Sequence, residues 1–129
     1  MHTIQTLLVD DSPEFLAATR EFLALDPAIQ VVGSTERGLD AMDQVRALKP
    51  DLVLLDLGMN DMNGMEVLRL LSALDKSPRV IILTLYNNPE YQAFAKKLGA
   101  AGFISKSDLG VQLMPAIHSL FPTDDSRDG

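Results

Sequence analysis

The sequence lacks cysteine and tryptophan altogether, and aromatic residues account for only 5% of its 129 residues. The absence of cysteine excludes disulfide bonds and zinc sites with thiolate ligands. No apolar run is long enough to cross a membrane, and the first residues do not have the layout of a secretory signal peptide. We therefore expect a cytoplasmic protein with an aliphatic core and no membrane attachment.

Basic residues are also scarce, because 11 lysines and arginines stand against 18 aspartates and glutamates, for a formal net charge of −7. Nucleic-acid-binding surfaces need clustered positive charge, so this balance argues against direct contact with DNA or RNA. It does permit a cation site. With 47% apolar residues the chain is too hydrophobic for a disordered protein, and its length suits one domain.

Apolar runs rich in branched residues alternate with helical patterns along the chain. Five strands are expected at residues 4–9, 29–33, 51–56, 79–84 and 102–105. Helices are expected after each strand, from Pro13 to about Asp26, over about 37–48, from Gly64 onwards, from Pro89 to Gly99, and after Ser107.

This alternation produces a parallel sheet with helices on both faces, and the common strand order for five such units is 2-1-3-4-5. We therefore predict an α/β protein with a single (βα)5 domain over residues 3–121. Residues 122–129 are predicted to form a polar tail or the start of a linker.

Helical spacing predicts which side chains face the core. In the fourth helix these are Tyr91, Phe94, Ala95 and Leu98. In the fifth helix Ser107 is a candidate N-cap, and Pro115 conflicts with a regular helix because proline has no backbone N–H. Either this helix starts late, near Val111, or it is kinked.

Polar residues stand at the ends of four apolar strands. They are Asp10 and Asp11 after the first strand, Asp56 at the end of the third, Thr84 at the end of the fourth and Lys106 after the fifth. Ligands of open parallel sheets bind beyond the carboxyl ends of the strands, where the strand order reverses. Taken singly, Asp10-Asp11, Thr84 and Lys106 are more often turn and cap residues, a strand residue and a solvated lysine, and Asp56 is an ordinary strand end about as often as not. Their coincidence on one edge is what predicts a site.

Three carboxylates that lie close together repel one another unless a cation lies between them. Magnesium prefers oxygen ligands and takes few carboxylates from a protein. We expect Asp56 and Asp11 to bind Mg²⁺ directly, Asp10 to act through water, and a loop carbonyl near Gly58 to be a further ligand.

Such an ion beside a carboxylate, with an ammonium and a hydroxyl nearby, suits phosphoryl transfer. In this interpretation Asp56 attacks phosphorus, Lys106 balances charge, and Thr84 donates to a phosphoryl oxygen. His2 and His118 are isolated and receive no role.

The chain resembles the receiver domain of a two-component response regulator over residues 3 to about 121. The matching residues are Asp10-Asp11, Asp56 within Leu55-Asp56-Leu57-Gly58-Met59, Gly64, Thr84, Phe103 and Lys106. The segment 99–106, Gly-Ala-Ala-Gly-Phe-Ile-Ser-Lys, looks most like the NarL/FixJ (LuxR-type) branch. The resemblance implies a flavodoxin-like receiver fold in a cytoplasmic phosphorelay that regulates an output, usually transcription.

The resemblance also implies that Asp56 becomes 4-aspartylphosphate, with a sensor histidine kinase, a phosphotransfer protein or a small molecule as donor. It further implies that Asp10, Asp11 and the Gly58 carbonyl bind Mg²⁺ and that Lys106 pairs with the phosphoryl group. Thr84 would shift to bond the phosphoryl group, and Phe103 would turn inward. The surface of the fourth helix, fifth strand and fifth helix then changes its partners, which include a second copy of the chain. No free substrate is turned over in this scheme.

Several features depart from the family pattern. Asn60 and Ser107 stand where many members have proline, and Pro115 disturbs the helix that commonly forms the output face. Leu85 follows the switch threonine where most members have Ala, Ser or Gly, and we expect it to narrow the approach to Asp56. No DNA-binding domain follows, so the chain is expected to be either a receiver cut from a longer protein or a receiver that acts alone.

Two other functions stay open. A Mg²⁺-dependent phosphohydrolase would use Asp56 as nucleophile, but such enzymes usually place a second acid two residues later, where this chain has Gly58. A receiver-like module would bind partners independently of phosphate, which Leu85 and Asn60 leave open. Dinucleotide binding is excluded because no Gly-x-Gly-x-x-Gly follows the first strand.

Overall fold

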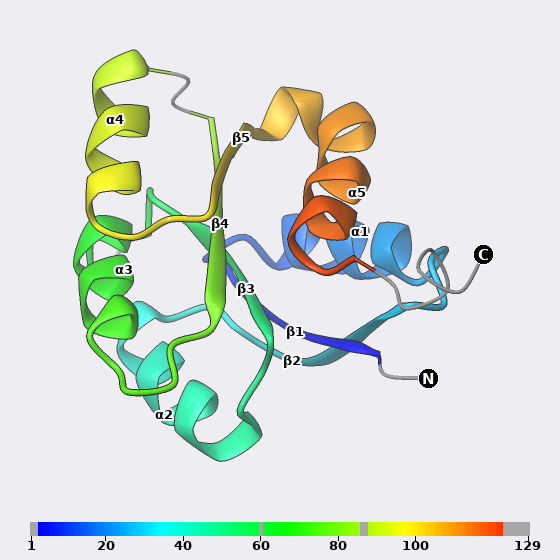
Figure 1. Cartoon of the computed structure of the whole chain (residues 1–129), viewed down its shortest axis with the longest axis horizontal. Helices are drawn as coiled ribbons and strands as arrows, with labels where there is room; N and C mark the ends of the chain where they lie inside the picture. The colour runs from blue at the N-terminus through cyan, green and yellow to red at the C-terminus, as the bar shows by residue number, and fades with distance from the viewer. Residues whose placement is uncertain (1–2, 60, 86–87, 123–129) are drawn as a thin grey trace.

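The structure is a computed structural model that describes residues 3–59, 61–85 and 88–122 (Figure 1). The strands are β1 (Ile4–Val9), β2 (Ile29–Thr35), β3 (Leu52–Asp56), β4 (Arg79–Thr84) and β5 (Gly102–Ser105). The helices are α1 (Pro13–Leu23), α2 (Gly38–Leu48), α3 (Gly64–Ser72), α4 (Pro89–Lys97) and α5 (Leu109–Leu120), with a 3₁₀ turn at Lys106–Asp108. No helix within the described ranges is long and apolar enough to span a membrane. Asn60 and residues 123–129 of the predicted tail lie outside them.

The five strands form one parallel sheet in the order β2-β1-β3-β4-β5, which confirms the predicted order. The order reverses between β1 and β3. In the pairing register Asp56 lies beside Leu83 and Thr84 lies beside Ser105. The carboxyl ends of the central strands therefore meet at one edge, as a site there requires.

Helices cover both faces of this sheet, with α1 and α5 on one side and α2, α3 and α4 on the other (Figure 1). Strand β3 supplies both layers, since Val53 and Leu55 pack under α2, α3 and α4 while Leu52 and Leu54 pack under α1 and α5. All of β3 is buried, which explains its uninterrupted apolar run. That burial fixes the position of Asp56 at its end.

The prediction that Tyr91 and Phe94 of α4 face the core is wrong, because these residues are 47% and 50% exposed. For α5 the structure excludes one of the two predicted alternatives, the late start, since the helix begins at Leu109 and holds Pro115 well inside. Pro115 and Val111 are both exposed, so water can bond the Val111 carbonyl that the proline leaves without a donor.

The predicted cap of α5 by Ser107 is also wrong. Asp108 stands at the N-cap position without a side-chain hydrogen bond. Ser107 instead belongs to the 3₁₀ turn, where the Ser105 hydroxyl accepts from its N–H. The hydroxyl that caps this short turn therefore belongs to Ser105, and Ser107 caps neither the turn nor the helix.

Candidate functional site

The acids at the ends of β1 and β3 lie together. Asp10, Asp11 and Asp56 each offer a carboxylate oxygen, and these oxygens all lie within 4.8 Å of one another. Asp10 and Asp56 are buried, and Asp11 is partly exposed. Two hydrogen bonds to backbone groups fix Asp10. Its N–H donates to the Thr35 carbonyl at 3.1 Å, and its Oδ1 accepts from the Ser12 N–H at 2.9 Å.

Lys106, the first residue after β5, points into this acid cluster. Its Nζ lies 2.7 Å from Asp10 Oδ2 and 3.6 Å from Asp56 Oδ1, and its side chain is only 12% exposed. The contact with Asp10 is an ion pair without hydrogen-bond alignment. The ammonium also lies 4.1 Å from the centre of the Phe15 ring, a cation–π contact. Lys106 is therefore part of the site and not an ordinary solvated lysine.

The cluster carries more negative charge than one lysine balances. Burial raises the pKa of the Asp56 carboxyl, and the charge of Asp10 raises it further. The Lys106 ammonium and the Gly58 N–H, which donates to the Asp56 carboxylate, act in the opposite direction. An oxygen-rich site with residual negative charge suits a hard divalent cation such as Mg²⁺.

The loop after Asp56 returns against the end of β3 at Gly64. The Gly64 N–H donates to the Leu57 carbonyl at 3.2 Å. A Cβ on Gly64 would lie 2.4 Å from the Asp56 carbonyl oxygen and 2.6 Å from Leu57 Cα. Because these are backbone atoms, any larger residue would displace Asp56 itself.

Three further predicted residues lie on or beside β4 and β5. Thr84 ends β4 and is fully buried, while Phe103 is partly buried against the core layer under α4. Phe103 also lines a surface hollow together with Gln92 and Lys96 of α4. Leu85 is 73% exposed, so its side chain projects into solvent. The movements of Thr84 and Phe103, and the narrowing by Leu85, stay predictions.

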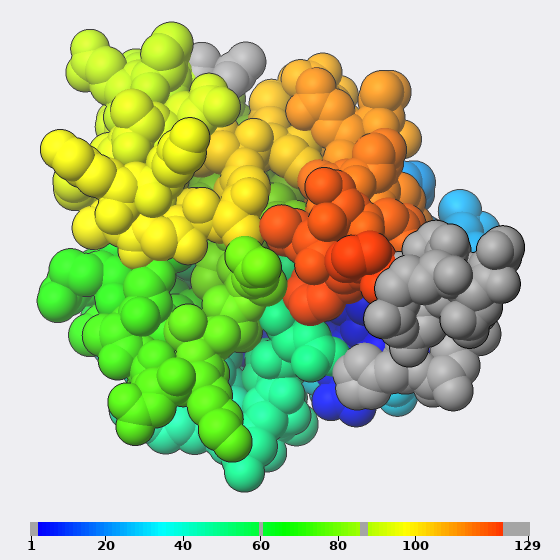
Figure 2. All heavy atoms as spheres, viewed as in Figure 1, coloured from blue at the N-terminus to red at the C-terminus, as the bar shows by residue number. Residues whose placement is uncertain are grey.

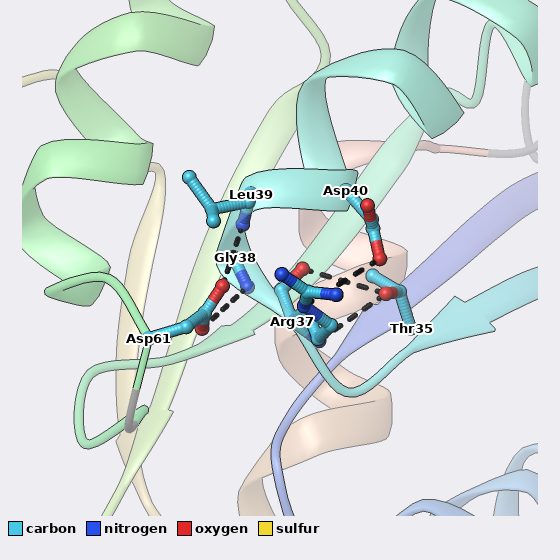
Figure 3. A network of polar contacts seen from close by, with 6 residues as sticks. All are labelled: Thr35, Arg37, Gly38, Leu39, Asp40 and Asp61. Carbon is cyan, nitrogen blue, oxygen red and sulfur yellow. Dashed lines mark hydrogen bonds and ion pairs between the residues drawn. The ribbon is translucent and has the colours of Figure 1, made fainter.

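One residue beside the site was not predicted. Asp61, in the loop between β3 and α3, accepts hydrogen bonds from the N–H groups of Gly38 and Leu39 at the start of α2, each at 2.9 Å (Figure 3). An aspartate among turn residues is ordinary, and its partners lie 23 and 22 residues earlier. No local pattern could have connected them.

Comparison with known sequences places these residues in one family. The family model for the response regulator receiver domain matches residues 6–118. The nitrate/nitrite response regulator protein NarL of Escherichia coli K12 is 35% identical over 112 residues, which cover 87% of this chain and 52% of NarL. A protein-glutamate methylesterase/protein-glutamine glutaminase of Vibrio vulnificus is 38% identical over 104 residues, which cover 80% of this chain and 30% of that protein. The chain thus spans about half the length of these relatives or less.

Solved structures share the fold over nearly the whole chain. The signal receiver domain of a NarL response regulator from Mycobacterium tuberculosis aligns with a TM-score of 0.86 at 27% identity, covering 93% of this chain and 97% of that one. The response regulator domain of Thermotoga maritima CheB aligns with a TM-score of 0.85 at 26% identity, covering 95% and 99%. With its matching family model, its NarL-type relatives and this shared fold, the chain belongs to the response regulator receiver domain family, in the NarL/FixJ branch.

Proposed function

We propose that this receiver domain is a phosphorylation switch with Asp56 as its phosphoryl acceptor. A carboxylate oxygen of Asp56 attacks the donor phosphorus, the bond from phosphorus to the donor's imidazole nitrogen breaks, and that nitrogen keeps the electron pair and takes up a proton. The observation that carries the proposal is the acid cluster of Asp10, Asp11 and Asp56, whose oxygens lie within 4.8 Å of one another with the Lys106 ammonium 3.6 Å from Asp56.

Asp10, Asp11, Asp56 and the Gly58 carbonyl are the groups that would hold Mg²⁺. The fit rests on the donor set, because three carboxylates against one ammonium leave a buried excess of negative charge. The ion would supply positive charge that offsets the repulsion between Asp56 and the incoming phosphoryl oxygens. Without an ion, the backbone N–H of Gly58 and the Lys106 ammonium both act to lower the pKa of Asp56.

The remaining site residues would respond to the phosphoryl group. Lys106 now lies 2.7 Å from Asp10, and a small movement of its ammonium would pair it with a phosphoryl oxygen. Thr84 would bond another oxygen, and Phe103 would turn inward beside it. These shifts would change the partners of the surface formed by α4, β5 and α5, a local charge event acting on a two-state element.

The partners that follow are a sensor histidine kinase or a phosphotransfer protein as donor, and a second copy of this chain at the α4-β5-α5 surface. We propose a cytoplasmic location and a transcriptional output that acts through a DNA-binding domain outside this chain. The receiver unit would span residues 3–121, followed from residue 122 by a polar tail or the start of a linker, which fits the end of α5 at Leu120. The domain would catalyse only its own phosphorylation and dephosphorylation.

The test is to treat wild type and Asp56→Asn with a phosphoramidate donor and Mg²⁺ and to separate the products on a Phos-tag gel. Wild type should give a retarded band that alkaline hydroxylamine removes, and Asp56→Asn should give none. Undiminished labelling of Asp56→Asn would sink the assignment. Partner binding that the substitution leaves unchanged would favour the phosphate-independent module, and steady hydrolysis of a phosphate ester would favour the phosphohydrolase.

Asp56→Asn also provides its own folding control. Because burial raises the pKa of the Asp56 carboxyl, the folded protein binds this proton more tightly than the unfolded chain. The stability that depends on Asp56 therefore falls as pH rises through the raised pKa. At neutral pH the metal-free variant should resist urea better than wild type. A variant that is unlabelled and also less stable would indicate misfolding and not loss of the acceptor.

A further inference from the structure

Helix α2 begins without a capping side chain of its own. Its N-cap residue, Arg37, has extended backbone and makes no side-chain hydrogen bond to the helix. Helices α1, α3 and α4 are each capped by the side chain of the residue before them. In α2 the carboxylate of Asp61 takes this place, since Oδ1 accepts from the Gly38 N–H and Oδ2 from the Leu39 N–H, both at 2.9 Å (Figure 3).

The contact uses both oxygens of one carboxylate. The first N–H groups of a helix have no partner within the helix, and the positive end of the helix dipole favours an anion there. Accordingly, the N–H groups of Leu39 and Gly38 lower the pKa of the Asp61 carboxyl. Asparagine has a single acceptor oxygen and could make one strong bond of this kind, whereas alanine could make none.

Asp61 belongs to the loop that carries Gly58. The start of α2 packs closely against this loop, because a Cβ on Gly38 would lie 3.1 Å from Met62 Cβ and 3.2 Å from Met59 Cε. Met59 is itself buried. The loop is thus held to α2 by two hydrogen bonds and by apolar packing.

The same start of α2 also touches the opposite side of the acid cluster. The Thr35 carbonyl accepts from the Asp10 N–H at 3.1 Å, and the Thr35 hydroxyl accepts from the Arg37 N–H at 3.2 Å. The turn from β2 into α2 therefore contacts Asp10 through Thr35 and the Gly58 loop through Asp61. This turn therefore connects Asp10, at the end of β1, with the loop that follows Asp56 at the end of β3.

We infer that Asp61 is a positioning residue for the metal site, because it ties the loop that carries Gly58 to the start of α2 and so fixes Gly58 relative to Asp10. Gly58 supplies the N–H that bonds Asp56 and the carbonyl proposed as a metal ligand. The inference rests on the proposed function for the metal, but it concerns a contact that exists in the protein alone.

The test compares three variants by calorimetric titration with MgCl₂. Asp61→Ala should weaken Mg²⁺ binding about tenfold, the smaller end of what loss of a residue supporting metal ligands causes. Asp61→Asn should lie between Asp61→Ala and wild type, because one of the two bonds is kept. Asp40→Ala is the matched control, since Asp40 is also an acid in the first turn of α2 but contacts Arg37, at 4.0 Å, and should bind Mg²⁺ like wild type.

A second measurement needs no metal. In metal-free Asp61→Ala, the amides of Gly58 and Met59 should exchange with deuterium faster than in wild type, while amides in α5 should be unchanged. Phosphoramidate labelling should require more Mg²⁺ for half-maximal rate, yet reach a wild-type rate at saturating Mg²⁺. A higher Mg²⁺ requirement with an unchanged maximal rate indicates a role in positioning the metal site, whereas a lower maximal rate would indicate damage to Asp56.

Wild-type Mg²⁺ affinity and unchanged exchange in folded Asp61→Ala would overturn the inference. Equal losses in Asp61→Ala and Asp40→Ala would overturn it too, because they would trace the effect to α2 stability in general. If wild type bound Mg²⁺ and the variants behaved as expected, but no protein was labelled, the proposed phosphoryl transfer would fail while the inference held.

Discussion

Helices α3 and α4 begin in the same way but are held by the protein very differently. Each has nine residues and starts at an asparagine whose side chain accepts from the N–H two residues later. Helix α3 buries Gly64, Val67, Leu68 and Leu71, whereas α4 buries Ala95 alone. Capping residues thus determine where a helix starts, and tertiary packing determines how firmly it is held.

The difference matches the places of the two helices in the fold. Helix α3 follows the Asp56 loop, and its first residue, Gly64, lies against the Asp56 backbone. Helix α4 stands out at one corner of the molecule (Figure 2). Its Tyr91 and Phe94 are about half exposed. The helix beside the acceptor is firmly attached, and the helix in the proposed output surface is loosely attached. A loosely attached helix is the one that a small free-energy change can move.

The largest effect that would sharpen this comparison is on global stability. Leu71→Ala in α3 should lower the free energy of unfolding by about 3 kcal/mol, because it leaves a cavity in a fully buried layer. Phe94→Ala in α4 should change it by less than about 0.5 kcal/mol, since half of that side chain already contacts water. Urea denaturation measures both. Similar losses in the two variants would break the comparison.

The next effect is on local opening. Amides of α4 should exchange with deuterium about tenfold faster than those of α3 in the metal-free protein, because few buried contacts hold α4 to the sheet. Hydrogen exchange read by mass spectrometry or NMR measures this. Mg²⁺ with beryllofluoride should then change exchange in α4 more than in α3, and Asp56→Asn should remove that response. Equal exchange in the two helices of wild type would refute the contrast.

The smallest expected effect concerns α5. A side-chain hydrogen bond between His118 Nε2 and Asp26 Oδ2, 2.5 Å apart, connects this helix to the turn after α1. The hydrogen bond with His118 lowers the pKa of the Asp26 carboxyl below its ordinary value of about 3.8. The resulting stability is complete above that value and is lost as pH falls through the lowered pKa.

Asp26→Asn should therefore reduce the loss of unfolding free energy at acidic pH. The reduction should be less than about 1 kcal/mol, since the pair of Asp26 and His118 is partly solvated. Urea denaturation at successive pH values measures the profile. Asp43→Asn, at an exposed acid of α2, serves as control. An Asp26→Asn profile as steep as that of the control would show that the tie to α5 contributes nothing.

The fold followed from local signals. Apolar runs, proline and cap residues predicted all five strands and their helices, and β2 alone was predicted clearly too short, because Ser34 and Thr35 are polar. Periodicity failed for α4, since it identifies an apolar stripe but not whether another element covers it. It also could not decide how α5 accommodates Pro115, which depends on the exposure of one turn.

The site was predictable as a set of strand ends, because parallel strands bring their carboxyl ends to one edge. Sequence reasoning assigned Lys106 to the phosphoryl group, but in this structure its nearest carboxylate oxygen belongs to Asp10. It missed Asp61, whose partners are backbone N–H groups on a distant helix. Both details depend on tertiary geometry and leave no trace in residue spacing.

The shared cap of α2 limits how receivers of this kind can be recombined. A chimera that takes the segment 57–63 from another receiver would lose the Asp61 carboxylate unless the donor carries an acid at the same place. A chimera that exchanges α2 alone would face the same difficulty at Gly38, where a Cβ would crowd Met59 and Met62. The segment after the acceptor and the first turn of α2 therefore form one module, and engineered receivers should keep or exchange the two together.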